Sequence, residues 1–160
     1  MTPSQKYIDK VKELEGFKSA PYRDQAGNPT IGYGTCYYAN GTPVTMNDAE
    51  IDESTASDML VSKLNTLASQ LTSHLTAYGV APLNSNQFDV ILDFCYNEGI
   101  GQLVPSNCTF LREMIANVND PDIAFQLKRW DKDSAGNVEP GLVTRCEWRA
   151  ETYFTPIDVA

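Results

Sequence analysis

Histidine and cysteine are scarce in this 160-residue sequence, and the few present stand far apart. The only histidine is His74, and the four cysteines are Cys36, Cys95, Cys108 and Cys146, with no C-x-x-C pair among them. Zinc and similar sites need clustered ligands, so the sequence predicts no metal site and no cofactor. Whether any of the cysteines pair stays open, because a cysteine on an apolar helix face often behaves as a small buried hydrophobe.

Long hydrophobic runs are also absent. No stretch of about 18 apolar residues occurs, and the charged N-terminus "MTPSQKYIDKVKELEG" lacks the apolar core of a secretory signal. We therefore expect a soluble cytoplasmic protein without membrane insertion. With 42% hydrophobic residues, the chain is still long enough to bury a core of ordinary size.

Basic residues are few: 12 Lys and Arg stand against 21 Asp and Glu, for a net charge of −9. Proteins that bind polyanions concentrate Lys and Arg to neutralise phosphates, so nucleic acid is not expected as a partner. Loose electrostatic adhesion to anionic membranes or teichoic acids is not expected either. Recognition must instead depend on a cleft.

Helical periodicity is abundant. Apolar residues recur at helical spacing in several segments that begin with capping residues and end at glycine or in a polar loop. Thr2 with Gln5, and Asn84 with Gln87, have capping-box spacing, while Asp52 is suited to cap the longest helix. The predicted helices span residues 2–15, 53–77, 84–99, 107–118, 121–130 and 141–154.

Turn residues and short strands replace this periodicity from Tyr22 to about Val44, with "DQAGNPT", "TIGYGTCYY" and an Asn-Gly turn. The fold class expected is α+β, in one two-lobed domain. A small N-terminal lobe, residues 1–55, holds a short antiparallel sheet. The helix 53–77 connects it to a helical lobe, residues 80–160, and a cleft between lobes is a natural place for a ligand.

Two acids and a threonine near this sheet are suited to breaking a glycosidic bond, which needs one acid and one carboxylate. Glu15 precedes Gly16 and Phe17, a partly apolar setting that favours a protonated acid, whereas Asp24 lies in a polar turn. The Thr30 hydroxyl both donates and accepts, so it suits the holding of a water molecule. On spacing alone, a helix end and an Asx-turn explain both acids as well.

The stretch "LEGFKSAPYRDQAGNPTIGYGT" resembles the active-site segment of the phage-type lysozymes, glycoside hydrolase family 24. The family pattern Glu-Gly, Ala-x-Tyr-x-Asp and Gly-x-x-Thr-Ile-Gly-x-Gly is matched at residues 15–16, 20–24 and 27–34. The segments "FDVILDFCYNEGIG" and "LKRWDKDSAGNVEPGLVTRCEWRAETYF" extend the resemblance over nearly the whole chain. Thr35 departs from it, because several members have a histidine there that is not catalytic.

The resemblance implies an inverting muramidase that cleaves the β-1,4 bond between N-acetylmuramic acid and N-acetylglucosamine in peptidoglycan. Glu15 would be the general acid, Asp24 the carboxylate that activates water, and Thr30 the residue that helps hold that water. In inverting enzymes the two carboxyl groups lie roughly 6.5 to 9.5 Å apart, which leaves room for the water. Gly32 and Gly34 would let a long polymer pass close to the backbone.

The resemblance also points to substrate-binding residues in the second lobe. Arg145 falls where the family places a cation that can pair with the acidic Glu15, and Tyr96 and Asn97 fall where the family contacts the sugar. Each has a structural alternative: a solvated helix residue for Arg145, a buried ring for Tyr96 and a helix-end residue for Asn97.

Three further aromatic side chains and the histidine have competing interpretations. Tyr33 and Tyr37 alternate along a strand, so Tyr33 is a candidate substrate-binding residue, although packing of the sheet is equally consistent. Trp130 belongs to a helical apolar stripe, which favours packing over sugar stacking. His74 has no nearby Cys or Ser partner and is predicted to be an ordinary helix residue.

The resemblance further implies an endolysin without a separate wall-binding module. Such a monomeric enzyme would accumulate in the host cytoplasm and need a holin to reach the cell wall. Two alternatives remain within the same resemblance: a tail-associated lysin or antibacterial effector with the same chemistry, and a catalytically silent peptidoglycan-binding module. The presence of Glu15, Asp24 and Thr30 at family spacing speaks against the silent module.

Overall fold

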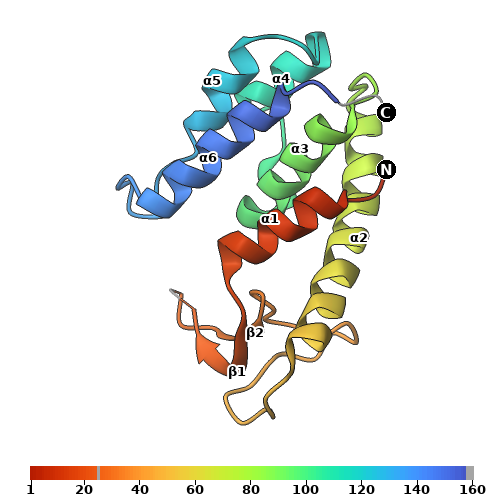
Figure 1. Cartoon of the computed structure of the whole chain (residues 1–160). Coiled ribbons are helices and arrows are strands. Elements are labelled where there is room, and N and C mark those ends of the chain that lie inside the picture. Colours follow the sequence, from red (N-terminus) through yellow and green to blue (C-terminus); the bar gives the residue numbers. More distant parts are fainter. Residues whose placement is uncertain (25, 158–160) are drawn as a thin grey trace. The chain divides into compact units, whose positions relative to one another are not determined.

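The protein has the α+β architecture expected from its sequence (Figure 1). A computed structural model describes residues 1–24 and 26–157. Its elements in chain order are α1 (Gln5–Glu15), β1 (Lys18–Arg23), β2 (Pro29–Gly32), α2 (Glu53–Ala77), α3 (Ser85–Glu98), the 3-10 turn η1 (Ile100–Gln102), α4 (Thr109–Ala116), α5 (Asp122–Lys128) and α6 (Pro140–Tyr153). Among the residues described, no helix is long and apolar enough to cross a membrane.

The chain separates into two compact units. One comprises Ser4–Thr66, and the other comprises Met1–Pro3 with Leu67–Ala160. The boundary lies inside α2, whereas the sequence-based lobes end near the two ends of that helix. Buried residues follow α2 on both sides of the boundary, from Ala56 to Leu75. A helix with a continuous apolar face contributes core residues along its whole length, so its ends do not mark the units.

The N-cap of helix α1 lies two residues later than predicted. The Ser4 side chain, not that of Thr2, accepts a hydrogen bond from the backbone N–H of Tyr7 at 3.1 Å. The helix ends as predicted at Glu15, because Gly16 adopts a positive φ of 69° and donates its N–H to the Lys12 carbonyl at 3.0 Å. This termination places Glu15 at the last helical position.

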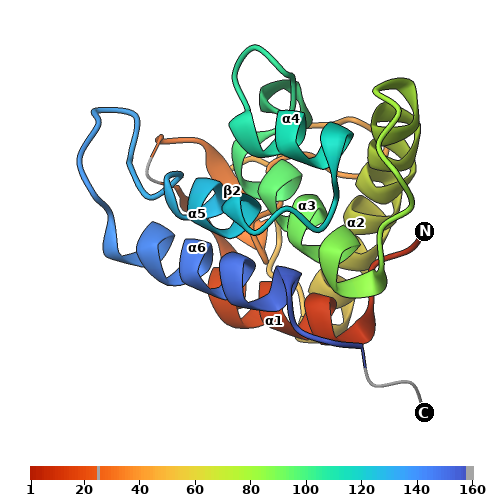
Figure 2. The ribbon, with the colours of Figure 1, turned by 90° about the horizontal axis from the view of Figure 1, so that it is seen from above.

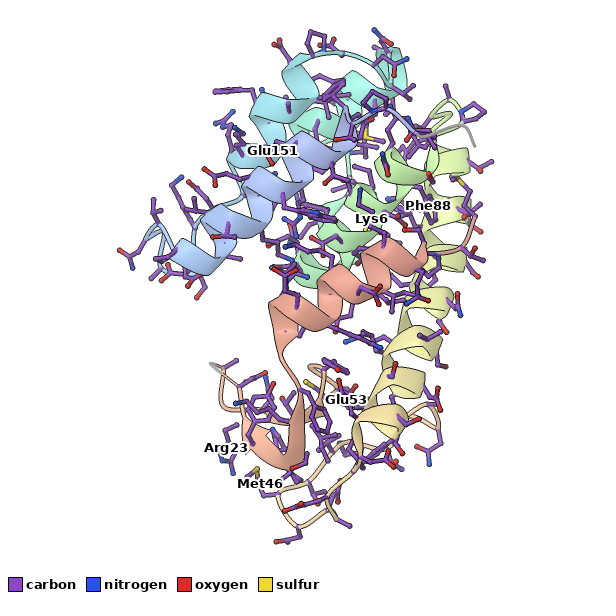
Figure 3. All side chains as sticks on the ribbon, viewed as in Figure 1. Lys6, Arg23, Met46, Glu53, Phe88 and Glu151 are labelled. Atoms are coloured by element: carbon purple, nitrogen blue, oxygen red, sulfur yellow. The ribbon has the colours of Figure 1, made fainter. Side chains whose placement is uncertain are left out.

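Strands β1 and β2 form a short antiparallel sheet, with Tyr22 opposite Thr30 and an irregularity between Lys18 and Tyr22. Gly32 lies at the end of β2 with a φ of 65°, and a Cβ placed there would lie 3.0 Å from the Ala56 side chain of α2. The prediction that this glycine leaves room for a polymer is therefore wrong: Gly32 is buried and allows β2 to pack closely on α2. In Figure 3, Arg23 and Glu53 mark the end of β1 and the start of α2.

In the second unit, α3 is buried along most of its length. The predicted capping box is confirmed, because Asn84 and Gln87 exchange hydrogen bonds between side chain and backbone at 2.9 and 3.0 Å. Helix α6 packs against α3 and α5, and α5 packs against α4 (Figure 2). Helices α4 and α5 are shorter than predicted, whereas α6 has the predicted length and begins one residue earlier.

Aromatic packing fills the centre of this unit. The Phe94 ring meets the rings of Phe110 and Trp130 edge-on, with centroids 4.9 and 4.7 Å apart. The packing role predicted for Trp130 is thus confirmed. His74 makes a short contact through Nε2 with the Leu103 carbonyl and packs edge-on against Tyr78, as an ordinary structural residue of α2 does.

Candidate active site

The three predicted catalytic residues all lie in the first unit. Glu15 ends α1, Asp24 follows β1 directly, and Thr30 lies in β2. The antiparallel pairing of β1 with β2 turns the chain back between Asp24 and Thr30, so the polar turn that contains Asp24 leads directly into the strand that holds Thr30.

Asn28 connects Asp24 to Thr30 through hydrogen bonds. Its backbone N–H donates to Asp24 Oδ1 at 2.8 Å, and its side-chain Nδ2 donates to Asp24 Oδ2 at 3.3 Å. Its carbonyl accepts from the Asp24 backbone N–H and from the Thr30 hydroxyl, both at 3.0 Å. The Asp24 carboxylate and the Thr30 hydroxyl are therefore held by one residue.

These bonds also set the charge of Asp24. The Asn28 backbone N–H is the main cause that lowers the pKa of Asp24, and burial opposes it as the second-largest effect. The Asn28 side chain and the N–H groups of Ala26 and Gly27 lower this pKa further. Asp24 thus forms an Asx-turn, which was the structural alternative to a catalytic role. The same turn keeps its carboxylate ionised, which is the state that a base requires.

Glu15 is half-buried and shares an electrostatic environment with Asp24. Burial is the main cause that raises the pKa of the Tyr22 phenol, and the nearby carboxyl groups of Glu15 and Asp24 act in the same direction. Both carboxyl groups therefore lie within electrostatic reach of one phenol. The separation expected for an inverting enzyme stays a prediction.

Tyr33 is a core residue of the first unit, with 3% of its surface exposed. Its hydroxyl donates to Glu53 Oε1 at 2.6 Å, and this bond is the main cause that raises the pKa of Tyr33 to about 12. Its ring packs on Phe17 with centroids 5.8 Å apart, and the Lys12 ammonium lies 5.8 Å from its centre. The geometry favours the packing role over sugar binding, whereas Tyr37 is 68% exposed.

Arg145 lies in the second unit and forms a buried ion pair that joins α6 to α3. Its Nε and Nη2 donate to both carboxylate oxygens of Asp93 at 2.8 to 3.2 Å, and Arg145 itself is 8% exposed. Arg149, one turn further along α6, donates from Nε to Asp93 Oδ2 at 2.7 Å. The alternative that Arg145 is a solvated helix residue is therefore wrong.

Tyr96 and Asn97 lie in the last turn of α3, and Tyr96 is near this ion pair. The Arg145 guanidinium lies 5.9 Å from the centre of the Tyr96 ring, and both Tyr96 and Asn97 are half-buried. Asn97 Nδ2 donates to Glu98 Oε1 at 2.7 Å. The structure thus brings Tyr96 and Arg145 together within the second unit, and their contact with sugar stays a prediction.

Two sets of residues escaped prediction from the sequence. Asn28 carries a recognisable turn signal, because Asn before Pro favours a turn, but its two bonded partners follow only from the closed loop. Asp93 and Arg149 gave no signal, since ion pairs 52 and 56 residues apart cannot be matched along the chain. Within residues 1–24 and 26–157, no group of three or more His, Cys, Asp or Glu side chains is placed to hold a metal ion.

Comparison with known proteins gives a consistent set of relatives. The family model described as phage lysozyme matches residues 12–149. An endolysin of Acyrthosiphon pisum secondary endosymbiont phage 1 is 28% identical over 147 residues, covering 89% of this chain and 90% of its own. An endolysin of Bacillus phage PZA is 31% identical over 147 residues, or 91% of this chain, which spans only 52% of that relative.

A solved structure agrees with these sequence relatives. The endolysin from Escherichia coli O157:H7 phage FAHEc1 superposes with a TM-score of 0.82 at 29% identity, over 96% of this chain and 94% of its own. A match of this extent covers nearly the whole fold of the chain.

Proposed function

The chain belongs to the phage lysozyme family, and from that premise we propose that it is an endolysin-type muramidase acting on bacterial peptidoglycan. The bond cleaved is the β-1,4 linkage between N-acetylmuramic acid and N-acetylglucosamine. The observation that carries the proposal is the Asp24–Asn28–Thr30 arrangement, in which an ionised carboxylate and a hydroxyl are fixed by one turn. Glu15, at the end of α1, supplies the second carboxyl group.

The proposed reaction is a single displacement. Glu15 gives its proton to the glycosidic oxygen as the bond to the anomeric carbon breaks. A water molecule held by Thr30 attacks that carbon from the opposite face, and Asp24 takes the proton that the water loses. The sugar leaves with inverted configuration, Glu15 is ionised and Asp24 is protonated, and exchange with solvent restores both groups.

The cellular role follows from the same premise. We propose that the enzyme acts as a monomer, accumulates in the host cytoplasm and reaches the wall when a holin permeabilises the membrane. The relatives named endolysins support this role. A tail-associated lysin or a delivered antibacterial effector has the same chemistry, and neighbouring genes separate these roles: a holin gene favours the endolysin, and tail or immunity genes favour the others.

Mass analysis of digested peptidoglycan tests the chemistry. The wild-type protein should release fragments with new reducing muramic-acid ends, and Glu15→Gln should lower their rate of release by about 10² to 10⁴-fold, because the leaving oxygen loses its acid. Glu13→Gln is the matched control, since Glu13 is an exposed residue of the same helix that pairs only with Lys10 in the contacts described.

Two results would overturn the proposal. A folded Glu15→Gln variant with normal turnover removes the acid assignment. Binding of the wild-type protein to peptidoglycan without release of any fragment identifies a silent binding module. A turbidity assay on bacteria with a permeabilised outer membrane distinguishes the second result directly.

A further inference from the structure

A cysteine lies against the water-holding threonine. Cys36 Sγ is 3.4 Å from Thr30 Oγ1, and the cysteine is half-buried and unpaired. The chain returns to Thr30 because Ile31 and Thr35 exchange both of their backbone hydrogen bonds, each at 2.9 Å. The Cys36 carbonyl is held in turn by the Val44 backbone N–H at 2.8 Å. Backbone hydrogen bonds at Thr35 and at the Cys36 carbonyl therefore fix the position of the thiol.

The direction of the hydrogen bond between these two side chains follows from a count of protons. A threonine hydroxyl has one proton and two lone pairs. Thr30 Oγ1 lies 3.0 Å from the Asn28 carbonyl, which can only accept, so the hydroxyl proton is used there. In the contact with Cys36, Thr30 must then be the acceptor, and the S–H of Cys36 must be the donor.

We infer that Cys36 is a positioning residue for the hydrolysis, an inference that rests on the function proposed above. The Thr30 hydroxyl donates its proton to the Asn28 carbonyl and accepts the thiol proton with one lone pair. Only its second lone pair is therefore available to the attacking water. The water must therefore donate one proton to Thr30 and the other to Asp24. Both lone pairs of the water then receive no hydrogen bond from Thr30, and one of them faces the anomeric carbon.

The alternative orientation would slow the reaction. If the Thr30 hydroxyl rotated and donated to the water, it would occupy one of the two lone pairs of the water and draw electron density from the attacking oxygen. That rotation would break the bond to the Asn28 carbonyl. The Cys36 thiol adds a positional restraint, because it occupies one of the two lone pairs of Thr30 and leaves the water a single place to bind. Cys36 thus acts on the water through Thr30.

A double-mutant cycle with Thr30 tests this role. Initial rates on solubilised peptidoglycan, measured against substrate concentration, are compared for Cys36→Ala, Cys36→Ser, Thr30→Val and the Cys36→Ala/Thr30→Val double variant. Cys36→Ala should lower kcat about fivefold with KM unchanged, as loss of one weak hydrogen bond predicts. Cys36→Ser keeps a donor and should recover most of that loss. In the Thr30→Val background, Cys36→Ala should have no further effect.

The contrary results are equally specific. The inference fails if Cys36→Ala retains the wild-type kcat, if Cys36→Ser is as slow as Cys36→Ala, or if Cys36→Ala slows Thr30→Val by the same factor as the wild type. Melting temperatures check the fold, and Cys36→Val replaces Cys36→Ala if the alanine variant unfolds. An inactive Glu15→Gln together with a fully active Cys36→Ala rejects this inference alone, whereas an active Glu15→Gln rejects the proposed function.

Discussion

Asn28 is the residue on which the proposed base and water-holding groups both depend. Its backbone N–H and side-chain amide bind the two oxygens of Asp24, while its carbonyl accepts the hydroxyl of Thr30. A carboxylate that receives such bonds is stabilised in its charged form. The turn between β1 and β2 therefore sets both where the base lies and the pH range in which it can act.

Asn28→Ala should move the acid limb of the pH–activity profile to higher pH. The variant keeps the backbone N–H, which is the main cause that lowers the pKa of Asp24, but loses the side-chain bond, so this pKa rises. A base works only when ionised, and a higher pKa means that activity is lost earlier as the pH falls. The plateau near pH 7 should change by less than about threefold, since the backbone bonds remain.

The profile is measured as initial rates between pH 3 and 8. Asn47→Ala is a suitable control, because Asn47 is an exposed turn residue whose side chain makes no hydrogen bond within the part of the chain described. An acid limb that stays in place, or moves to lower pH, in Asn28→Ala would show that the side chain of Asn28 does not tune Asp24.

At the scale of elements, one buried carboxylate joins α3 to α6. Asp93 is fully buried and receives Arg145 and Arg149, of which Arg149 is also fully buried. Burial by itself raises the pKa of Asp93, but the guanidiniums of Arg149 and Arg145 outweigh it and hold the pKa below its usual range. Because two arginines of α6 pair with one carboxylate, the packing of α6 on α3 depends on the Asp93 side chain.

Asp93→Asn should lower the free energy of unfolding by about 3 to 5 kcal/mol, because it leaves two guanidiniums in the core without their counter-charge. A group with a lowered folded-state pKa contributes stability that is present above its unfolded pKa, about 3.9, and is lost as the pH falls through the folded value. The wild type should therefore lose this contribution below about pH 4. Between pH 7 and pH 3, the free energy of unfolding should fall less in Asp93→Asn than in the wild type.

Urea unfolding at several pH values measures both effects. Asp58→Asn, at an exposed position of α2, controls for the removal of one negative charge. If Asp93→Asn proves no less stable than Asp58→Asn, the ion pairs do not support the packing of α6 on α3.

At the scale of the whole molecule, the net charge of −9 governs the approach to the substrate. Bacterial walls that carry teichoic acids are also anionic, so long-range repulsion opposes association. This repulsion reaches about 30 Å at 0.01 M ionic strength and about 8 Å at 0.15 M. The enzyme therefore approaches the wall polymer against electrostatic repulsion, and short-range contacts must provide the affinity.

The initial rate of wall lysis should therefore rise severalfold as sodium chloride increases from about 0.01 to 0.15 M, because screening removes the repulsion. An uncharged soluble oligosaccharide with the same linkage should show no such rise. A rate on walls that falls with added salt would mean that local positive charge, not the net charge, controls association.

Local signals account for what the sequence determined by itself. The end of α1 at Glu15, the start of α3 at Asn84 and the span of α2 depend on glycines, capping side chains and apolar spacing within a few residues of each position. The α+β class follows from the same signals. Glu15, Asp24 and Thr30 were recognisable because they lie in one short segment with a specific pattern.

Only the tertiary structure decided which distant groups meet. It buried Tyr33 against Phe17 and Glu53, set Gly32 against Ala56, and paired Asp93 with arginines more than fifty residues away. It also brought the Cys36 thiol onto Thr30, the residue named at the outset only for its hydroxyl. These contacts depend on how elements pack and turns close, which local propensity does not encode.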